Sequence, residues 1–216
     1  LDDVSHELRT PITVVRGHME LLDPSDRDDV VETRALVIDE IDRMGTLVGD
    51  LLELARASDT VTPSSVDVEA LTEAVLDKAR ALGQRRWNLE ASASLTCCLD
   101  PVRITQAWLQ LAQNAVQYSA AGTDVGIGSA SDSQWVRLWV RDKGVGIAPG
   151  DIERIRGRFV RGSSGTEHVA GSGLGLSIVE SIARAHGGHL DIESIPGEGS
   201  TFTLVIPLRP CGASGE

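Results

Sequence analysis

Two stretches of apolar residues at helical spacing fill the first 55 residues and constrain the fold more than any other feature. The first stretch places its apolar side chains on one helical stripe: Leu1, Val4, Leu8, Val15, Met19 and Leu22. The second alternates steps of four and three, the spacing of a coiled-coil seam: Val37, Ile41, Met44, Val48, Leu51 and Ala55. The polar residues 23–25 separate the two, so the chain begins with a predicted helical hairpin. One hairpin cannot bury both stripes, so two copies related by a two-fold axis would form a four-helix bundle.

The pattern changes after a polar segment at residues 58–65, which contains Pro63 and is predicted to be a linker. Helical and extended patterns then interleave. We expect helices over 68–82, 102–118 and 174–186, and strands over 87–91, 123–129, 135–141, 189–193 and 201–206. This order predicts a layer of helices packed on a mixed sheet. The Gly-, Arg- and Ser-rich segment 149–171 has weak periodicity and is predicted to be a functional lid.

Charge and cysteine content exclude several classes of protein. The formal net charge is -12, whereas binding to nucleic acid or to an anionic membrane surface would need a basic surface. Cys97, Cys98 and Cys211 show no metal-binding spacing and predict no disulfide framework, which favours a reducing cytosol. No apolar run approaches the roughly 18 residues of a membrane span. We therefore expect a cytoplasmic fragment without direct membrane contact.

One histidine lies off the apolar stripe of the first helix. At 100° per residue, His6 lies about 200° from Val4 and points to solvent, and Thr10 lies about 40° from His6 on the same face. Glu7 adjoins both, and Pro11 removes a backbone hydrogen bond and favours a kink. An ordinary surface histidine beside a proline kink would have the same pattern. A nucleophilic histidine must also be exposed in this way, because its reaction partner has to reach it.

Two later segments carry groups that suit a nucleotide. The helix expected over 102–118 ends in QLAQNAVQY (110–118), where the amide oxygen of Asn114 is a hard ligand suited to Mg²⁺. An apolar strand leads into DKGVGI (142–147), whose glycines permit a tight turn. The carboxylate of Asp142 can accept a hydrogen bond from an adenine amino group. Taken alone, the first segment is a helix-surface amide and the second a strand-ending turn.

Two glycine-rich segments complete the set. The sequence GSGLGL (171–176) opens an apolar helix, and backbone N–H groups at a helix start form an anion site for phosphates. It has neither the spacing of the dinucleotide fingerprint nor the Lys of a Walker loop, and a flexible Gly loop is the simpler alternative. The sequence GEGSTF (197–202) enters the last expected strand.

The order and spacing of these segments resemble a known family. The sequence SHELRTP (5–11) closely resembles the phosphoacceptor box of two-component sensor histidine kinases. The four later segments resemble the N box and the glycine boxes of the GHKL ATP-binding fold, which histidine kinases share with gyrase and MutL. The sequence RFVR (158–161) resembles the F box within the lid of the kinase branch. The resemblance covers residues 1 to about 208.

The resemblance implies a multidomain organisation. Residues 1–57 would form an all-α dimerisation and histidine-phosphotransfer domain, a hairpin that makes a dimeric four-helix bundle. Residues 58–65 would be the linker, and 66–208 the catalytic ATP-binding domain, an α/β sandwich of the GHKL or Bergerat type. Residues 209–216 would be a flexible tail. The full-length protein is expected to be anchored in the cell membrane by a segment upstream of this fragment.

The resemblance also implies roles for individual residues, with ATP and Mg²⁺ as cofactors. Asp142 would bind the adenine amino group, and the base would be surrounded by Tyr118, Gly144, Gly146, Ile147 and Thr201. Asn114 would hold Mg²⁺ against the triphosphate, and Gln110, one turn before it, would be part of the nucleotide site. Arg161 would reach the γ-phosphate, and the phosphates would be cradled by Gly171, Gly173, Leu174, Gly175 and Leu176.

The chemistry that the family implies is autophosphorylation of a histidine within a homodimer. His6 would attack the γ-phosphorus, with Glu7 as base or orienting partner, mostly by positioning and charge neutralisation. The phosphoryl group would then pass to an aspartate on the receiver domain of a response regulator. Thr10 would orient a water molecule that hydrolyses that aspartyl phosphate, unless its hydroxyl only bonds back to the helix.

Two positions depart from the family pattern and keep alternatives open. Gln110 stands where Asn is common, and Gln117 stands where Lys or Arg is common, which removes a positive charge near the phosphates. A catalytically weak pseudokinase scaffold that binds ATP would fit these changes, although His6, Glu7 and Asp142 are intact. A GHKL ATPase that drives motion would need a general-base Glu where Gln110 stands.

Overall fold

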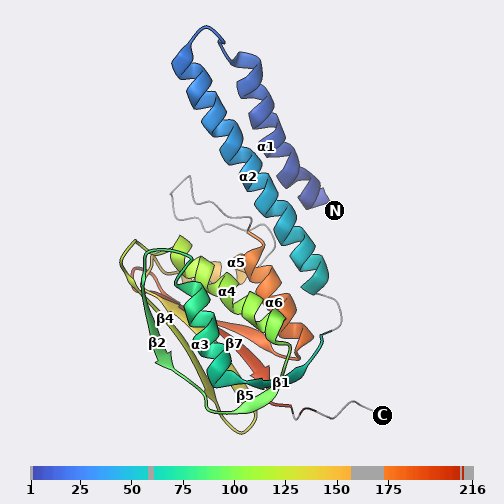
Figure 1. Cartoon of the computed structure of the whole chain (residues 1–216), viewed down its shortest axis with the longest axis vertical. Helices are drawn as coiled ribbons and strands as arrows, with labels where there is room; N and C mark the ends of the chain where they lie inside the picture. The colour runs from blue at the N-terminus through green and yellow to red at the C-terminus, as the bar shows by residue number, and fades with distance from the viewer. Residues whose placement is uncertain (1, 58–60, 157–172, 210, 212–216) are drawn as a thin grey trace.

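The computed structural model describes residues 2–57, 61–156, 173–209 and 211. A helical hairpin is followed by an α/β domain (Figure 1). The hairpin consists of α1 (Asp2–Leu21) and α2 (Arg27–Ala57). The turn between them is fixed by Asp23, whose carboxylate accepts a hydrogen bond from the Ser25 backbone N–H at 2.8 Å. The hairpin that the apolar stripes predict is therefore confirmed.

The apolar seam of α2 is divided between two environments. Near its C-terminal end, Leu47 is buried, and Leu51 and Leu54 pack against the core of the α/β domain. There α2 contacts α6 (Gly175–Ala185), which lies beside the lower part of α2 in Figure 1. Ile41 and Val48, in contrast, remain exposed in the single chain. Part of the apolar seam of α2 therefore packs against the α/β domain of the same chain, which the periodicity alone did not predict.

In the residues that the structure describes, the α/β domain contains two sheets, three longer helices and two short helical turns. Its elements after the hairpin are β1 (Ser64–Asp67), α3 (Val68–Ala79), β2 (Arg86–Ala91), β3 (Thr96–Leu99), α4 (Pro101–Gln117), β4 (Asp124–Ser131), β5 (Trp135–Asp142), η1 (Pro149–Asp151), α5 (Ile152–Ile155), α6 (Gly175–Ala185), β6 (His189–Ile195) and β7 (Gly199–Pro207). The main sheet has the order β2-β4-β5-β7-β6, with β2 parallel to β4 and the other pairs antiparallel. β1 and β3 form a separate antiparallel pair.

The helices α3, α4 and α6 form a layer against the main sheet (Figure 1). Trp108 of α4 is fully buried in the core between them, and its indole N–H donates to the Trp139 carbonyl of β5 at 3.0 Å. The start of α4 is fixed by Asp100, whose carboxylate accepts from the Val102 and Arg103 backbone N–H groups. The expected helix layer on a mixed sheet is confirmed.

Some local expectations differ from the structure. The predicted linker reaches to residue 65, but β1 already begins at Ser64 and pairs with β3. Neither strand was expected, because four-residue strands are too short to show a clear period. In the expected lid, residues 149–155 form the two short helical turns η1 and α5, and residues 157–171 lie outside the described part of the chain. Among the described helices, none is sufficiently long and apolar to cross a bilayer.

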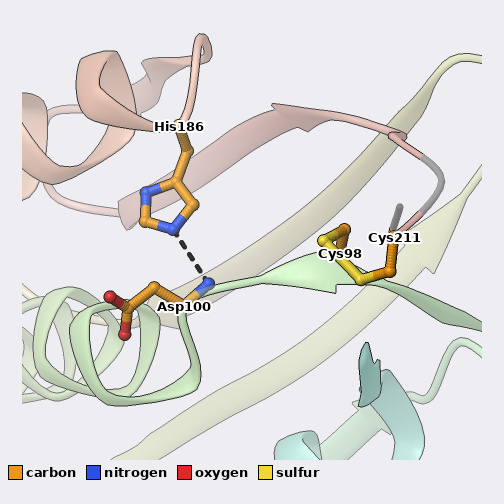
Figure 2. The surroundings of a disulfide bond; sticks show 4 residues. All are labelled: Cys98, Asp100, His186 and Cys211. Carbon is orange, nitrogen blue, oxygen red and sulfur yellow. Dashed lines mark hydrogen bonds between the residues drawn. A yellow bond between two sulfur atoms is a disulfide. The ribbon is translucent and has the colours of Figure 1, made fainter. Parts of the chain in front are cut away.

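A disulfide bond corrects the expectation that the cysteines are unpaired. Cys98 of β3 is bonded to Cys211, with their Cα atoms 4.9 Å apart (Figure 2). A backbone hydrogen bond also holds the end of the chain beside β3, because the Cys98 N–H donates to the Arg209 carbonyl at 3.3 Å. Cys97 points to the other side of β3, and burial raises the pKa of its thiol. Adjacent cysteines in a strand face opposite ways, so only one of them can meet the chain end.

A buried histidine lies beside the disulfide. The Asp100 backbone N–H donates to Nε2 of His186 at 3.2 Å (Figure 2), and Nδ1 lies 2.8 Å from the Ile182 carbonyl. These contacts suit a neutral ring that carries its proton on Nδ1. Burial lowers the pKa of His186, which also favours the neutral form. The end of α6 is thus joined to the start of α4 on the side of the domain that carries the disulfide.

Candidate nucleotide site

The C-terminal part of α4 lies against the first turn of α6. A Cβ atom on Gly175 would lie 3.1 Å from Oε1 of Gln110 and 3.8 Å from Oδ1 of Asn114. Both amide side chains therefore reach the N-terminus of α6, where backbone N–H groups and the helix dipole favour anions. The structure thus brings Gln110, Asn114 and Gly175 together.

Asp142 ends β5 with a nearly buried carboxyl group, since only 5% of the residue is exposed. Burial raises the pKa of Asp142, and hydrogen bonds from the Gly144 and Ser200 backbone N–H groups oppose that rise. The Gly144 N–H donates to Oδ1 at 2.8 Å. These two donors fix the orientation of the carboxyl group, and a carboxylate has further lone pairs that can accept hydrogen bonds.

The loop after Asp142 is held between two other segments. The Val145 N–H donates to the Tyr118 carbonyl at 3.2 Å, and the Val145 carbonyl accepts from the Gly197 N–H at 2.8 Å. The loop thereby connects the end of α4 to the turn between β6 and β7.

The loop after Asp142 comes so close to the backbone of these two segments that two of its positions require glycine. A Cβ atom on Gly144 would collide with the Tyr118 backbone carbonyl. Gly146 has φ of +66°, and a Cβ there would collide with the Ile195 carbonyl. The tight turn expected from the glycines of segment 142–147 is present. The half-buried Ile147 belongs to this loop, and the half-buried Tyr118 lies beside it.

The structure does not bring the Thr201 side chain to Asp142. Thr201 pairs with Arg141 across β5 and β7, and its hydroxyl accepts from the Arg141 guanidinium at 3.2 Å. This contact lies on the outer face of the sheet. Ser200 is the partner of Asp142 in the same ladder, and both residues are buried on the inner face. The position beside Asp142 thus belongs to Ser200, which the sequence reasoning missed.

The remaining expected residues are placed as follows. Gly173 has φ of +70°, Leu174 is buried, and Leu176 is half-buried near the start of α6. Thr10 is exposed on α1, and Pro11 lies within that helix. The backbone of α1 includes positions 6 and 7, but the side chains of His6 and Glu7, together with Arg161 and Gly171, lie outside the described residues.

Among the described residues, no group of three or more His, Cys, Asp or Glu side chains could hold a metal ion. A Mg²⁺ ion can instead be held by one or two protein oxygens together with substrate phosphates and water. The amide oxygen of Asn114 beside the α6 N-terminus fits that mode of binding.

Comparisons with known proteins agree with both parts of the chain. Residues 1–60 match the family model of the His Kinase A (phospho-acceptor) domain. Residues 99–210 match that of the "Histidine kinase-, DNA gyrase B-, and HSP90-like ATPase". Both assignments fall where the phosphoacceptor sequence and the nucleotide segments lie.

Several named proteins are similar over nearly the whole chain. The phosphate regulon sensor protein PhoR of Pseudomonas aeruginosa is 36% identical over 211 residues, covering 93% of this chain and 48% of PhoR. The histidine-protein kinase/phosphatase MprB of Mycolicibacterium vanbaalenii is 34% identical, covering 99% of this chain and 47% of MprB. The chain thus spans about half the length of these relatives. The structure of the Acinetobacter baumannii histidine kinase AdeS superposes with a TM-score of 0.71 at 28% identity, covering 94% of this chain and 98% of that one.

Proposed function

The chain belongs to the two-component sensor histidine kinases, and from this premise we propose that it binds Mg-ATP and phosphorylates its own His6. The observation that carries the proposal is that α4 brings two amides, Gln110 and Asn114, to the N-terminus of α6, while Tyr118 at its C-terminal end contacts the loop after the buried carboxyl group of Asp142. This set of groups suits a nucleoside triphosphate, because it offers an acceptor for the base and donors for the phosphates.

The base would be recognised by Asp142. Its carboxylate would accept a hydrogen bond from the exocyclic amino group of adenine, while Gly144 and Gly146 let the backbone approach the flat ring. Ser200 takes the position that we expected for Thr201, since it lies opposite Asp142 on the inner face. Tyr118 and Ile147 would complete the walls around the base.

The triphosphate would extend from the base to the start of α6. The first-turn N–H groups there, near Gly173, Leu174, Gly175 and Leu176, would donate to phosphate oxygens. Asn114 would supply an oxygen ligand to Mg²⁺, which when bound neutralises phosphate charge. Gln110 would orient the same phosphates through its amide. The roles of Arg161 and Gly171 remain predictions from the family pattern.

Phosphoryl transfer would form a bond between an imidazole nitrogen of His6 and the γ-phosphorus. The bond from that phosphorus to the bridging oxygen breaks, and ADP leaves. Glu7 would orient the ring by accepting a hydrogen bond from the N–H of the other imidazole nitrogen, and would take that proton as the attacking nitrogen forms its bond to phosphorus. The phosphoryl group would then pass to an aspartate on the receiver domain of a cytoplasmic response regulator.

A homodimer would bury the apolar side chains that α1 and α2 expose in the single chain. Ile41 is 56% exposed and Met19 is 54% exposed in the single chain, although both belong to the predicted apolar stripes. Burial against a second copy would remove this apolar surface from water and complete a four-helix bundle. The pseudokinase alternative gains no support from the relatives, whose names describe sensor proteins and kinases.

Replacing Asp142 with Asn tests the nucleotide site. The change puts an amide N–H₂ against the adenine amino group, which loses the acceptor and leaves a buried donor unpaired. Because such a loss costs about 1–3 kcal/mol, we expect ATP affinity measured by calorimetry to fall by roughly 10- to 100-fold. Asp191→Asn, at an exposed carboxylate of β6, is the matched control and should bind ATP normally. Normal affinity in Asp142→Asn would place the nucleotide elsewhere.

Replacing Thr10 with Ala tests the proposed phosphatase role. If its hydroxyl orients water, the variant should keep autophosphorylation but lose roughly tenfold or more in dephosphorylation of the response regulator that accepts its phosphoryl group. Thr13→Ala is the control, because the Thr13 hydroxyl donates to the Arg9 carbonyl at 2.9 Å and has a structural contact. Equal dephosphorylation rates for wild type and Thr10→Ala would exclude the role.

A further inference from the structure

The C-terminal end of α4 is the point where the loop after Asp142 is attached. The last carbonyl groups of a helix have no partner within the helix, so they need donors from elsewhere. The Ala115 carbonyl accepts from the Ser119 hydroxyl, and the Tyr118 carbonyl accepts from the Val145 N–H at 3.2 Å. The position of the loop therefore depends on how the last turn of α4 is held.

The side chain of Arg85 provides further donors to this helix end. Its Nη2 group donates to the Val116 carbonyl at 2.6 Å and to the Ser119 carbonyl at 2.7 Å, and its Nε group donates to the Ser119 hydroxyl at 3.0 Å. The last turn of α4 contains no basic residue of its own. The guanidinium group thus places a positive charge where the helix dipole is negative, and it holds residues on both sides of Tyr118.

The backbone around Arg85 is fixed by bonds of its own. The Gly122 N–H donates to the Gln84 carbonyl at 2.8 Å, and the Arg86 N–H donates to the Thr123 carbonyl at 2.9 Å. Arg86 then begins β2, which pairs with β4 in the main sheet. The half-buried Arg85 side chain is therefore presented to the end of α4 from the edge of the sheet.

We propose that Arg85 is a positioning residue for nucleotide binding: it fixes the end of α4 so that Tyr118 and the loop attached to it surround the adenine base. The inference rests on the proposed ATP-binding function and adds to it a residue that acts from outside the site. The influence of Arg85 passes through the two carbonyls that it caps to Tyr118, and through the Tyr118 carbonyl to the loop at Val145.

The test measures Mg-ATP binding by calorimetry in wild type, Arg85→Ala and Arg85→Lys. Without its donors the last turn of α4 should fray, so Arg85→Ala should bind ATP about tenfold more weakly, as for other residues that act on a ligand through their neighbours. Lysine keeps the positive charge but lacks the planar fork, so Arg85→Lys should recover only part of the loss. In autophosphorylation by Arg85→Ala, the KM for ATP should rise by a similar factor and kcat should stay within about twofold.

A spectroscopic measurement separates positioning from stability. Tyr118 is the only tyrosine of the chain, so isotope-labelled tyrosine gives NMR signals from this position alone. In the absence of ATP, Arg85→Ala should shift or broaden the Tyr118 ring signals, because the end of α4 is no longer held. A contribution to stability alone would lower Tm and leave these signals unchanged in the folded protein.

The matched control is Arg86→Ala, one position further along the chain. The Arg86 guanidinium pairs with Asp124 of β4 at 2.7 Å and its side chain is 68% exposed, so its loss should leave ATP affinity and the Tyr118 signals unchanged. Binding is measured at a temperature at which circular dichroism shows each variant to be folded. If Arg85→Ala does not fold, Arg85→Lys decides in its place.

Three results would overturn the inference: wild-type ATP affinity or unchanged Tyr118 signals in folded Arg85→Ala, full ATP affinity in Arg85→Lys, or an equal loss of affinity in Arg86→Ala. Failure of the wild type to bind ATP would instead overturn the proposed function.

Discussion

Replacement of His6 by Gln is expected to abolish the transfer of radiolabelled phosphate from Mg-ATP to the protein. Glutamine keeps a polar side chain that suits a helix, but its amide nitrogen is not a nucleophile, so no N–P bond can form. ATP binding measured by calorimetry should stay normal, because the proposed nucleotide site lies in the α/β domain. The expected pattern is thus full binding without labelling.

The matched control for His6 lies on the same helix. His18 is an exposed histidine in the last turn of α1, outside the phosphoacceptor sequence. His18→Gln should label like wild type, which separates the loss of a nucleophile from the loss of any histidine. Undiminished labelling of His6→Gln would show that another residue accepts the phosphoryl group.

Reduction of the bond between Cys98 and Cys211 is expected to lower thermal stability strongly. The two cysteines are 113 residues apart, so the bond closes a loop that includes the part of the α/β domain from α4 to β7. Closing a loop of that length in the unfolded chain is worth about 4–5 kcal/mol in the chain-entropy model. For a protein of this size, the corresponding decrease in Tm on adding reductant is roughly 10 °C.

Variants of the three cysteines separate the bond from other effects of the reductant. Cys211→Ser should have the Tm of the reduced wild type and should not respond to reductant. Cys97→Ala keeps the bonded pair and should still respond, since Cys97 carries a separate buried thiol. If thiol titration shows full reduction of the wild type while its Tm stays the same, the bond contributes nothing to stability.

The parts of the fold that the sequence predicted are those with long, regular patterns. α1, α2, α4 and α6 were expected because each carries an apolar stripe over three or more turns. The nucleotide motifs lie at element ends, so their order along the chain was sufficient to predict which groups would meet. Gln110 and Asn114 at the α6 N-terminus are the clearest example.

The parts that the sequence did not predict depend on the pairing of distant strands. Side chains alternate between the two faces of a sheet, so a register difference of one residue exchanges Ser200 and Thr201. That register is set by pairing between β5 and β7, which lie about sixty residues apart in the sequence. The disulfide has the same origin, because its partner becomes visible only when the end of the chain crosses β3.

The most direct measurement of the central claim is the chemical identity of the phosphorylated residue after incubation with Mg-ATP. A phosphohistidine bond is broken by acid and survives base, whereas phosphoserine and phosphothreonine survive acid. The account predicts an acid-labile, base-stable phosphoprotein, with the phosphate mapped by mass spectrometry to the peptide that contains His6. An acid-stable phosphate, or one mapped to any other peptide, would contradict it.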